Sequence, residues 1–251
     1  MSIMVKAVLT ACLLIAGDAT MADAAGRGCP APGADPRLPS AAAVRRAVIG
    51  EGPVRIVCLG SSSTQGVGAS GPAASYPARL AAILAGRLPP GRGVEVVNKG
   101  VGGETVADNL ARLERDVMAL RPGLVIWQVG TNDALRGVPS AEVRAGLVEG
   151  IARIRAAGAA VVLMDPQPAR PGKEGAEAIG TMADLVGEVA AKTGVPLVAR
   201  HAAMRRWLAE GELAPAALYA PDGLHMSDVG YACLAEAVAD LLLPVAPVIG
   251  R

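Results

Sequence analysis

Short apolar runs alternate with amphipathic segments along most of the chain. The apolar runs predict five strands, at residues 54–59, 94–97, 124–129, 159–164 and 195–198. Between them, apolar residues recur at helical spacing, which predicts helices at 75–88, 105–120, 140–157, within 175–193, at 202–208 and at 227–242. The third apolar run is interrupted only by Gln128, as expected for a strand in a sheet that is covered on both faces.

This alternation predicts an α/β fold. We expect a three-layer α/β/α arrangement, with helices on both faces of a flavodoxin-like, mostly parallel, five-stranded sheet. A chain of 251 residues is long enough for one such domain and too short for a convincing two-domain enzyme. We expect the domain at 51–251, a signal peptide at 1–24, and a linker with a short helix at 25–50.

The first residues have the pattern of a secretory signal peptide. Lys6 supplies a positive charge, residues 7–16 are apolar, and the Ala-Asp-Ala sequence that ends at Ala24 offers a cleavage site. The apolar run is too short to span a bilayer. We therefore expect export to the periplasm or the medium, without stable membrane insertion after cleavage. The alternative is a tail that is not removed.

The chain has four cysteines, of which Cys12 would leave with the signal peptide. Three then remain, an odd number. Cys58 in the first strand and Cys233 in the last helix are expected to be small buried residues. A disulfide from Cys29 is possible, but its partner, Cys58 or Cys233, stays open.

Composition narrows the range of functions. The net charge is +1, and the basic residues are scattered among acidic ones, which argues against nucleic-acid binding. With two Trp, three Tyr and no Phe, the core must be built from small aliphatic side chains, and an aromatic platform for sugars is not expected. Nothing resembles a metal cluster or a phosphate-binding loop, so we expect no metal and no cofactor.

Polar and glycine residues follow three of the predicted strands, and a fourth such stretch lies near the C-terminus. These stretches are 60–66, 98–103, 130–133 and 222–225. In open α/β folds, ligands bind at the carboxyl ends of the strands, so these residues are candidates for chemistry. Asp133 is expected to support its loop. Asp165 or Gln167, after the fourth strand, could contact substrate, although a turn is the plainer interpretation.

The order of serine, glycine, asparagine and histidine in these stretches resembles the SGNH (GDSL-type) hydrolase family, over about residues 54–240. The family motif Gly-Asp-Ser-x-Thr matches Gly60, Ser62 and Thr64, so the resemblance implies that Ser62 is the nucleophile. Because three serines are consecutive, Ser61 and Ser63 stay as alternatives. Ser61 also stands where the family usually has aspartate. Whether this chain makes the hydrogen bonds that such an aspartate makes to the surrounding loop therefore stays open.

His225 is the expected general base. The only other histidine, His201, has no neighbouring carboxylate in sequence and is expected to pack in a loop or at the surface. Asp222 lies three residues before His225, across Gly223 in a turn. This spacing lets the carboxylate reach one ring nitrogen while the other faces Ser62. The alternative is that Asp222 caps a turn or the last helix and that His225 is merely exposed.

Acyl transfer develops negative charge on the carbonyl oxygen, which fixed N–H donors must stabilise. The resemblance implies that the backbone N–H groups of Ser62 and Gly103 and the side chain of Asn132 form this oxyanion hole. Gly100 and Gly102 are expected only to give the loop flexibility. The alternative for Asn132 is a turn in which its side chain bonds locally.

These residues together predict an exported serine esterase. It would hydrolyse carboxylic esters, with short acyl groups such as O-acetyl, on a small molecule or a carbohydrate, through a Ser-His-Asp triad and an acyl-enzyme. One alternative is a lysophospholipase or thioesterase that acts on longer acyl chains. Another is a non-catalytic binding module on the same fold. Its only support is that Ser61 stands where the family usually has aspartate. Natural substrate and oligomeric state stay open.

Overall fold

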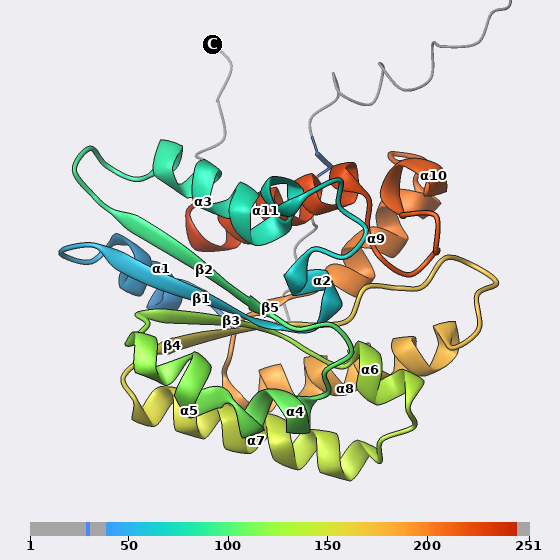
Figure 1. Cartoon of the computed structure of the whole chain (residues 1–251), viewed down its shortest axis with the longest axis horizontal. Coiled ribbons are helices and arrows are strands. Elements are labelled where there is room, and N and C mark those ends of the chain that lie inside the picture. Colours follow the sequence, from blue (N-terminus) through green and yellow to red (C-terminus); the bar gives the residue numbers. More distant parts are fainter. Residues whose placement is uncertain (1–28, 31–38, 245–251) are drawn as a thin grey trace, which may run out of the picture.

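The computed structural model of the chain describes residues 29–30 and 39–244. Its centre is a sheet of five strands in the order β2-β1-β3-β4-β5, and all neighbouring strands are parallel. The strands are β1 (Val54–Gly60), β2 (Val94–Gly100), β3 (Leu124–Gln128), β4 (Ala160–Met164) and β5 (Leu197–Val198). The predicted five-stranded parallel sheet is therefore confirmed (Figure 1).

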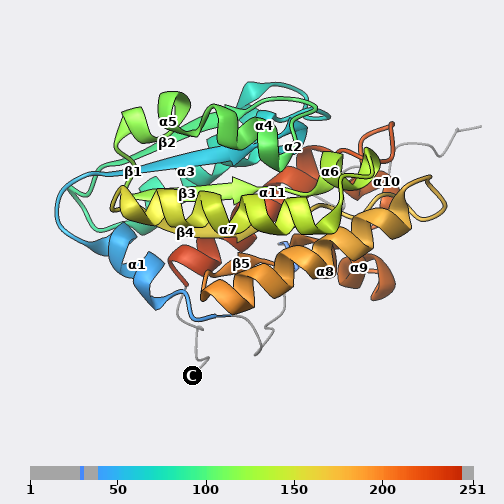
Figure 2. The same ribbon diagram turned by 90° about the horizontal axis from the view of Figure 1, so that it is seen from below.

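Helices cover both faces of this sheet and bury two separate hydrophobic cores. One face packs against α1 (Ala42–Ile49), α3 (Tyr76–Arg87), α9 (Arg200–Ala209) and α11 (Asp228–Leu242). The other packs against α4 (Val106–Ala111), α5 (Leu113–Asp116), α7 (Ser140–Ala156) and α8 (Ala176–Thr193). Figure 2 shows α7 and α8 lying along this second face. The predicted three-layer α/β/α arrangement is confirmed.

Strand β1 explains why residues 56–59 are all apolar. Ile56 and Cys58 join the core on the α3 face, while Val57 and Leu59 join the core on the α7 face. All four side chains are completely buried. Because successive side chains of a strand point to opposite faces, a strand between two helical layers needs apolar residues at every position.

Some short elements were not predicted. The helices α2 (Ser62–Gln65), α6 (Thr131–Leu135) and α10 (Pro215–Leu218) and the 3-10 turn η1 (Pro72–Ala74) are too short to show a periodicity. The expected helix at 105–120 is divided into α4, α5 and the 3-10 turn η2 (Met118–Leu120). No proline or glycine causes the break between α4 and α5. It falls at Arg112, a buried residue whose guanidinium bonds to the ends of strands β1 and β2.

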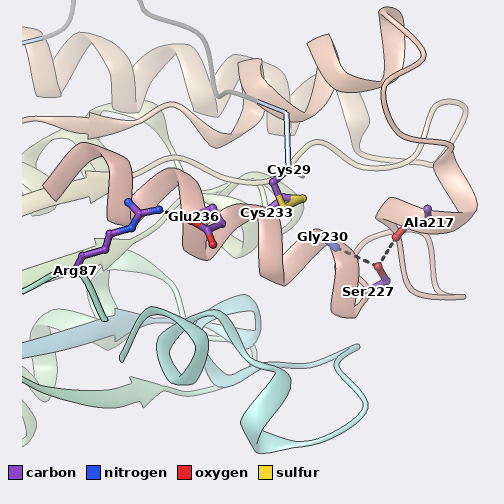
Figure 3. Close-up of a disulfide and its surroundings, with 7 residues drawn as sticks. All are labelled: Cys29, Arg87, Ala217, Ser227, Gly230, Cys233 and Glu236. Atoms are coloured by element: carbon purple, nitrogen blue, oxygen red, sulfur yellow. Dashed lines mark hydrogen bonds and ion pairs between the residues drawn. A yellow bond between two sulfur atoms is a disulfide. The ribbon is translucent and has the colours of Figure 1, made fainter. Parts of the chain in front are cut away.

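A disulfide between Cys29 and Cys233 links the N-terminal segment to α11 (Figure 3), with 5.0 Å between their Cα atoms. Cys233 is buried, as predicted, but it is not a free thiol; Cys58 is buried and free. The partner could not be chosen from sequence because the two cysteines are 204 positions apart.

Helix α11 is fixed at several further points. Its N-cap residue Ser227 accepts a hydrogen bond from the Gly230 N–H at 3.2 Å and donates one to the Ala217 carbonyl (Figure 3). In the middle of the helix, Glu236 pairs with Arg87 of α3 at 2.5 Å. These contacts matter for function because α11 begins three residues after His225.

The predicted signal peptide at 1–24 lies outside the described residues, as does most of the linker. Within residues 29–30 and 39–244, no helix is both long and apolar enough to cross a membrane.

Reducing the Cys29–Cys233 bond should lower the free energy of unfolding by about 2–5 kcal/mol, because the cross-link restricts a long loop in the unfolded chain. Urea titration of the oxidised and reduced protein measures the difference. Cys29→Ser protein is the matched control, since a reductant should leave its midpoint unchanged. An equal effect of the reductant on both proteins would contradict a stabilising role for this disulfide.

Candidate active site

The ends of β1 and β2 bring the first two polar stretches together. The strands are paired along their whole length, and Gly60, the last residue of β1, lies opposite Gly100, the last residue of β2. The loops that follow therefore start side by side, one leading to Ser62 and the other to Gly103. Figure 1 shows these strands ending at the side of the sheet where α2 and α6 lie.

The turn from β1 into α2 is fixed by Gln128 at the end of β3. The carbonyl oxygen Oε1 of Gln128 accepts hydrogen bonds from the Ser61 N–H at 2.9 Å, the Ser61 hydroxyl at 3.1 Å and the Thr64 hydroxyl at 3.2 Å. A Cβ on Gly60 would lie 2.8 Å from the same oxygen, so this position requires glycine. Ser61 therefore bonds to a neutral amide here.

The three consecutive serines have different surroundings. Ser61 and Ser63 are buried, and the Ser63 hydroxyl donates to Gln167 Oε1 at 2.9 Å. Only the Ser62 hydroxyl contacts His225, with 2.8 Å between Oγ and the ring nitrogen Nε2. The structure thus pairs the predicted nucleophile, and neither of its alternatives, with the predicted base.

Asp222 completes a chain of three hydrogen-bonded residues. Its Oδ2 lies 2.5 Å from His225 Nδ1, and its Oδ1 accepts the backbone N–H groups of Leu224 and His225, each at 2.9 Å. Partial burial would raise the pKa of the Asp222 carboxyl, but the hydrogen bonds from the His225 ring and these N–H groups lower it to about 2. The carboxylate is therefore ionised throughout the neutral range.

The loop that carries His225 is bound on two sides. Gln167, fully buried, donates to the Leu224 carbonyl at 3.3 Å and accepts the Ser63 hydroxyl, so it bridges this loop and α2. On the other side Gly68, with φ of +91°, approaches so closely that a Cβ would lie 2.9 Å from His225 Cβ. The sequence interpretation left Gln167 as a turn residue. No local pattern signals this bridge, since its partners come from distant parts of the chain.

The predicted oxyanion donors lie along the neighbouring loop and α6. Gly103 has φ of +82°, and within the described part of the chain its N–H, like that of Ser62, bonds to no other protein atom. The Gly102 N–H is occupied by Gln65 Oε1 at 2.9 Å, and a Cβ on Gly102 would lie 3.9 Å from Ser62 Cβ. The loop therefore passes directly beside Ser62, and of its last two N–H groups only that of Gly103 is free.

Of the two glycines expected to make this loop flexible, one does more. A Cβ on Gly100 would lie 2.7 Å from Gln65 Cα and would overlap the backbone of α2. At Gly102 a Cβ would come within 3.0 Å of the Gln65 side chain. Gly100 is therefore required by close approach to the backbone of the helix that carries Ser62, so the expectation of flexibility alone was wrong for this glycine, whereas a Cβ on Gly102 would meet only the end of a flexible side chain.

Asn132 and Asp133 begin α6 and bind the oxyanion loop from the far side. The Asn132 amide nitrogen donates to the Glu104 carbonyl at 2.8 Å, a contact from α6 to the oxyanion loop rather than a local turn. Since the amide carries two hydrogens, one stays available. Buried Asp133 accepts the Val106 N–H at 3.0 Å, which confirms its predicted supporting role, and burial raises its pKa.

His201 and Asp165 form a separate contact near β5. The backbone N–H of His201 donates to Asp165 Oδ1 at 2.9 Å, and the His201 ring packs beside Gly180 of α8. Burial raises the pKa of the Asp165 carboxyl to about 7 and lowers that of His201. His201 therefore lies half-buried in the first turn of α9 rather than in a loop or at the surface, and Asp165 is a buried residue rather than only part of a turn.

Comparison with known proteins adds independent information. The model of the non-GDSL lipase-like family matches residues 29–247. Esterase TesA from Pseudomonas aeruginosa is 32% identical over 165 residues, which are 65% of this chain and 78% of TesA. An arylesterase from Vibrio mimicus is 29% identical over 171 residues, 67% of this chain and 78% of that protein. The crystal structure of the acetylxylan esterase Axe2 from Geobacillus stearothermophilus superposes with a TM-score of 0.66 at 27% identity, covering 78% of this chain and 96% of Axe2.

Proposed function

The chain belongs to the non-GDSL lipase-like family and is a carboxylic ester hydrolase of the SGNH type, and on this premise we propose that Ser62, His225 and Asp222 are its catalytic triad. The observation that carries the proposal is the continuous chain from Ser62 Oγ through His225 to Asp222, with contacts of 2.8 and 2.5 Å. A serine hydroxyl becomes a useful nucleophile only when a base takes its proton.

The ionised Asp222 selects the tautomer of His225. With the carboxylate at Nδ1, the ring proton stays on that nitrogen, and Nε2 carries the lone pair that accepts the Ser62 proton. Ser62 Oγ attacks the ester carbonyl carbon as this proton moves to Nε2. The proton then passes to the alcohol oxygen when the C–O bond of the ester breaks.

Water completes the reaction. It attacks the acyl-enzyme as His225 again takes a proton, and the returning proton restores the Ser62 hydroxyl and releases the carboxylic acid. In both steps the carbonyl oxygen carries negative charge. We assign its stabilisation to the free N–H groups of Ser62 and Gly103 and to the second amide hydrogen of Asn132.

We propose a short acyl group, such as acetyl, on a small molecule or a carbohydrate as the substrate. Two facts support this choice. The Asp222 side chain is 47% exposed and Ser62 is only partly buried, so the triad lies at the protein surface. Among similar proteins, Axe2 is named an acetylxylan esterase and the Vibrio mimicus protein an arylesterase.

A longer acyl or aryl group is a second candidate, favoured by three exposed apolar side chains. Val67 follows α2, Val101 precedes the oxyanion glycine, and Leu135 lies one turn after Asn132, with exposed fractions of 38%, 44% and 44%. Such side chains could bind a longer hydrocarbon chain. Comparing kcat/KM for p-nitrophenyl acetate and p-nitrophenyl octanoate separates the two candidates.

We also propose that the enzyme acts outside the cytoplasm. The N-terminal sequence has the signal-peptide pattern, and the Cys29–Cys233 disulfide suits an oxidising compartment.

Ser62→Ala should lower the turnover of p-nitrophenyl acetate by about 10⁴-fold or more, since the triad acts as a unit. Ser63→Ala is the matched control, because it removes a hydroxyl that bonds to Gln167 and not to His225, and it should lose far less activity than Ser62→Ala. Turnover that survives in Ser62→Ala and disappears in Ser63→Ala would move the nucleophile. A wild-type protein without turnover and without labelling by a fluorophosphonate probe would instead favour a binding module.

Asn132→Ala should lower kcat by about 10²–10³-fold, the scale expected for loss of one oxyanion donor. Steady-state kinetics on the folded variant measure the effect. Asn132→Asp keeps the shape of the side chain without its N–H donors, and it should lose as much. An unchanged kcat in folded Asn132→Ala protein would remove this residue from the site.

Export should remove the first 24 residues, so the mature protein should begin at Ala25. Mass spectrometry of the protein recovered from the periplasm or medium tests this cleavage. Recovery there with Met1 intact would rule out a cleaved signal peptide.

A further inference from the structure

We propose that Glu104 and Arg112 are a positioning pair that sets the geometry of the oxyanion hole, although neither reaches the reacting atoms. The inference rests on the proposed function, because it assigns a role to residues that act through Gly103 and Asn132. Its evidence is a buried polar network that connects the oxyanion loop to the ends of three strands.

Glu104 is bound at both its backbone and its side chain. Its carbonyl accepts the Asn132 amide at 2.8 Å, and its carboxylate Oε2 accepts Asn109 Nδ2 at 2.6 Å and Arg112 Nε at 2.7 Å. Glu104 directly follows Gly103 in the chain. Glu104 therefore lies between two of the proposed oxyanion donors. A peptide bond joins it to Gly103, and it accepts a hydrogen bond from Asn132.

Arg112 connects this residue to the sheet. Its guanidinium pairs with Glu104 at 2.6 Å and also donates to the carbonyls of Lys99 at 2.7 Å and Gly60 at 3.3 Å. These carbonyls lie at the carboxyl ends of β2 and β1, and Gly60 is two residues before Ser62. The guanidinium thus fixes the oxyanion loop relative to the strand that delivers the nucleophile.

Asn109 extends the network to the third strand. Its Oδ1 accepts the indole N–H of Trp127 in β3 at 2.8 Å, while its Nδ2 binds Glu104. Both Asn109 and Trp127 are buried. From the solvent side, Arg136 donates to the Gly103 carbonyl at 2.7 Å, so the successive carbonyls of Gly103 and Glu104 both accept side-chain hydrogen bonds.

The burial of the Glu104–Arg112 pair indicates that it does more than stabilise the fold. The side chains of Arg112 and Glu104 are only 7% and 15% exposed, and removing two charges from water is costly. Apolar residues of similar volume often give equal or greater stability than such a pair. An ion pair whose side chains also bond to Asn109 and to the carbonyls at the ends of two strands is, however, well suited to fixing donors within a fraction of an ångström, on which transition-state stabilisation depends.

Glu104→Gln tests the proposal, since it keeps the size of the side chain and removes its charge. We expect kcat for p-nitrophenyl acetate to fall about 10- to 100-fold, with KM changed by less than about 3-fold, because displaced donors weaken only transition-state binding. The matched control is Glu188→Gln, which alters an Arg–Glu pair between α7 and α8, where Arg144 lies 2.9 Å from Glu188. It should keep the wild-type kcat.

A double-mutant cycle with Asn132→Ala separates positioning from general structural damage. If Glu104 positions Asn132 as well as Gly103, the fall in kcat of the double variant should be smaller than the product of the two single falls. Additive losses would overturn the proposal, as would an unchanged kcat in Glu104→Gln or an equal fall in Glu188→Gln. Should Glu104→Gln fail to fold, Arg112→Lys supplies the same measurement while keeping the positive charge.

The rate of Ser62 labelling by a fluorophosphonate gives a readout that needs no ester substrate, because the P=O oxygen uses the same donors. It should fall in Glu104→Gln by a factor similar to that in kcat. Wild-type protein with neither turnover nor labelling would refute the proposed function itself. Normal wild-type turnover with an unaffected Glu104→Gln variant would refute this inference alone.

Discussion

The site depends on the close contact between one end of the sheet and helix α2. Gly60 and Gly100 end two paired parallel strands in register, and neither position has room for a Cβ. Gly60 approaches Gln128, and Gly100 approaches the backbone of Gln65. This contact places Ser62 at a fixed height above the strand ends, and the positions of the proposed base and oxyanion donors follow from it. Because both faces of a parallel sheet are buried by helices, the strand ends are also where polar loops can meet.

The proposed base arrives from the opposite end of the sequence, and its position depends on α11. The loop at 222–225 is bound by Gln167 on one side and approaches Gly68 on the other. Directly after it, α11 is fixed by its cap, by the pair of Arg87 with Glu236, and by the disulfide to Cys29. The hydrogen-bonded chain from Ser62 to Asp222 therefore joins two rigid parts of one domain, which limits the reorganisation needed before reaction.

Local patterns were enough to predict the strands, most long helices and the order of the site motifs. A strand between two helical layers leaves an apolar run, and the spacing of Asp222 and His225 encodes their contact within a single turn. What could not be predicted depends on pairs distant in sequence. Gln128 meets Ser61 across 67 positions and Gln167 meets Ser63 across 104, while Cys233 meets Cys29 across 204. The break at Arg112 belongs to the same class, since its cause is the strand carbonyls that the guanidinium binds.

The serine at position 61 shows how such a distant partner changes the interpretation of a motif. Read alone, Ser61 departs from the aspartate of the family pattern and weakens the case for an enzyme. In the fold, the Gln128 carbonyl oxygen accepts both the Ser61 N–H and its hydroxyl, together with the Thr64 hydroxyl. Three donors converge on one neutral acceptor, and the turn that presents Ser62 is fixed without a buried negative charge. An ionised carboxylate at position 61 could not donate to the Gln128 oxygen as the Ser61 hydroxyl does, and it would place a charge in a buried site. Ser61 and Gln128 are therefore best understood as a matched pair, and the departure at one is explained by the other.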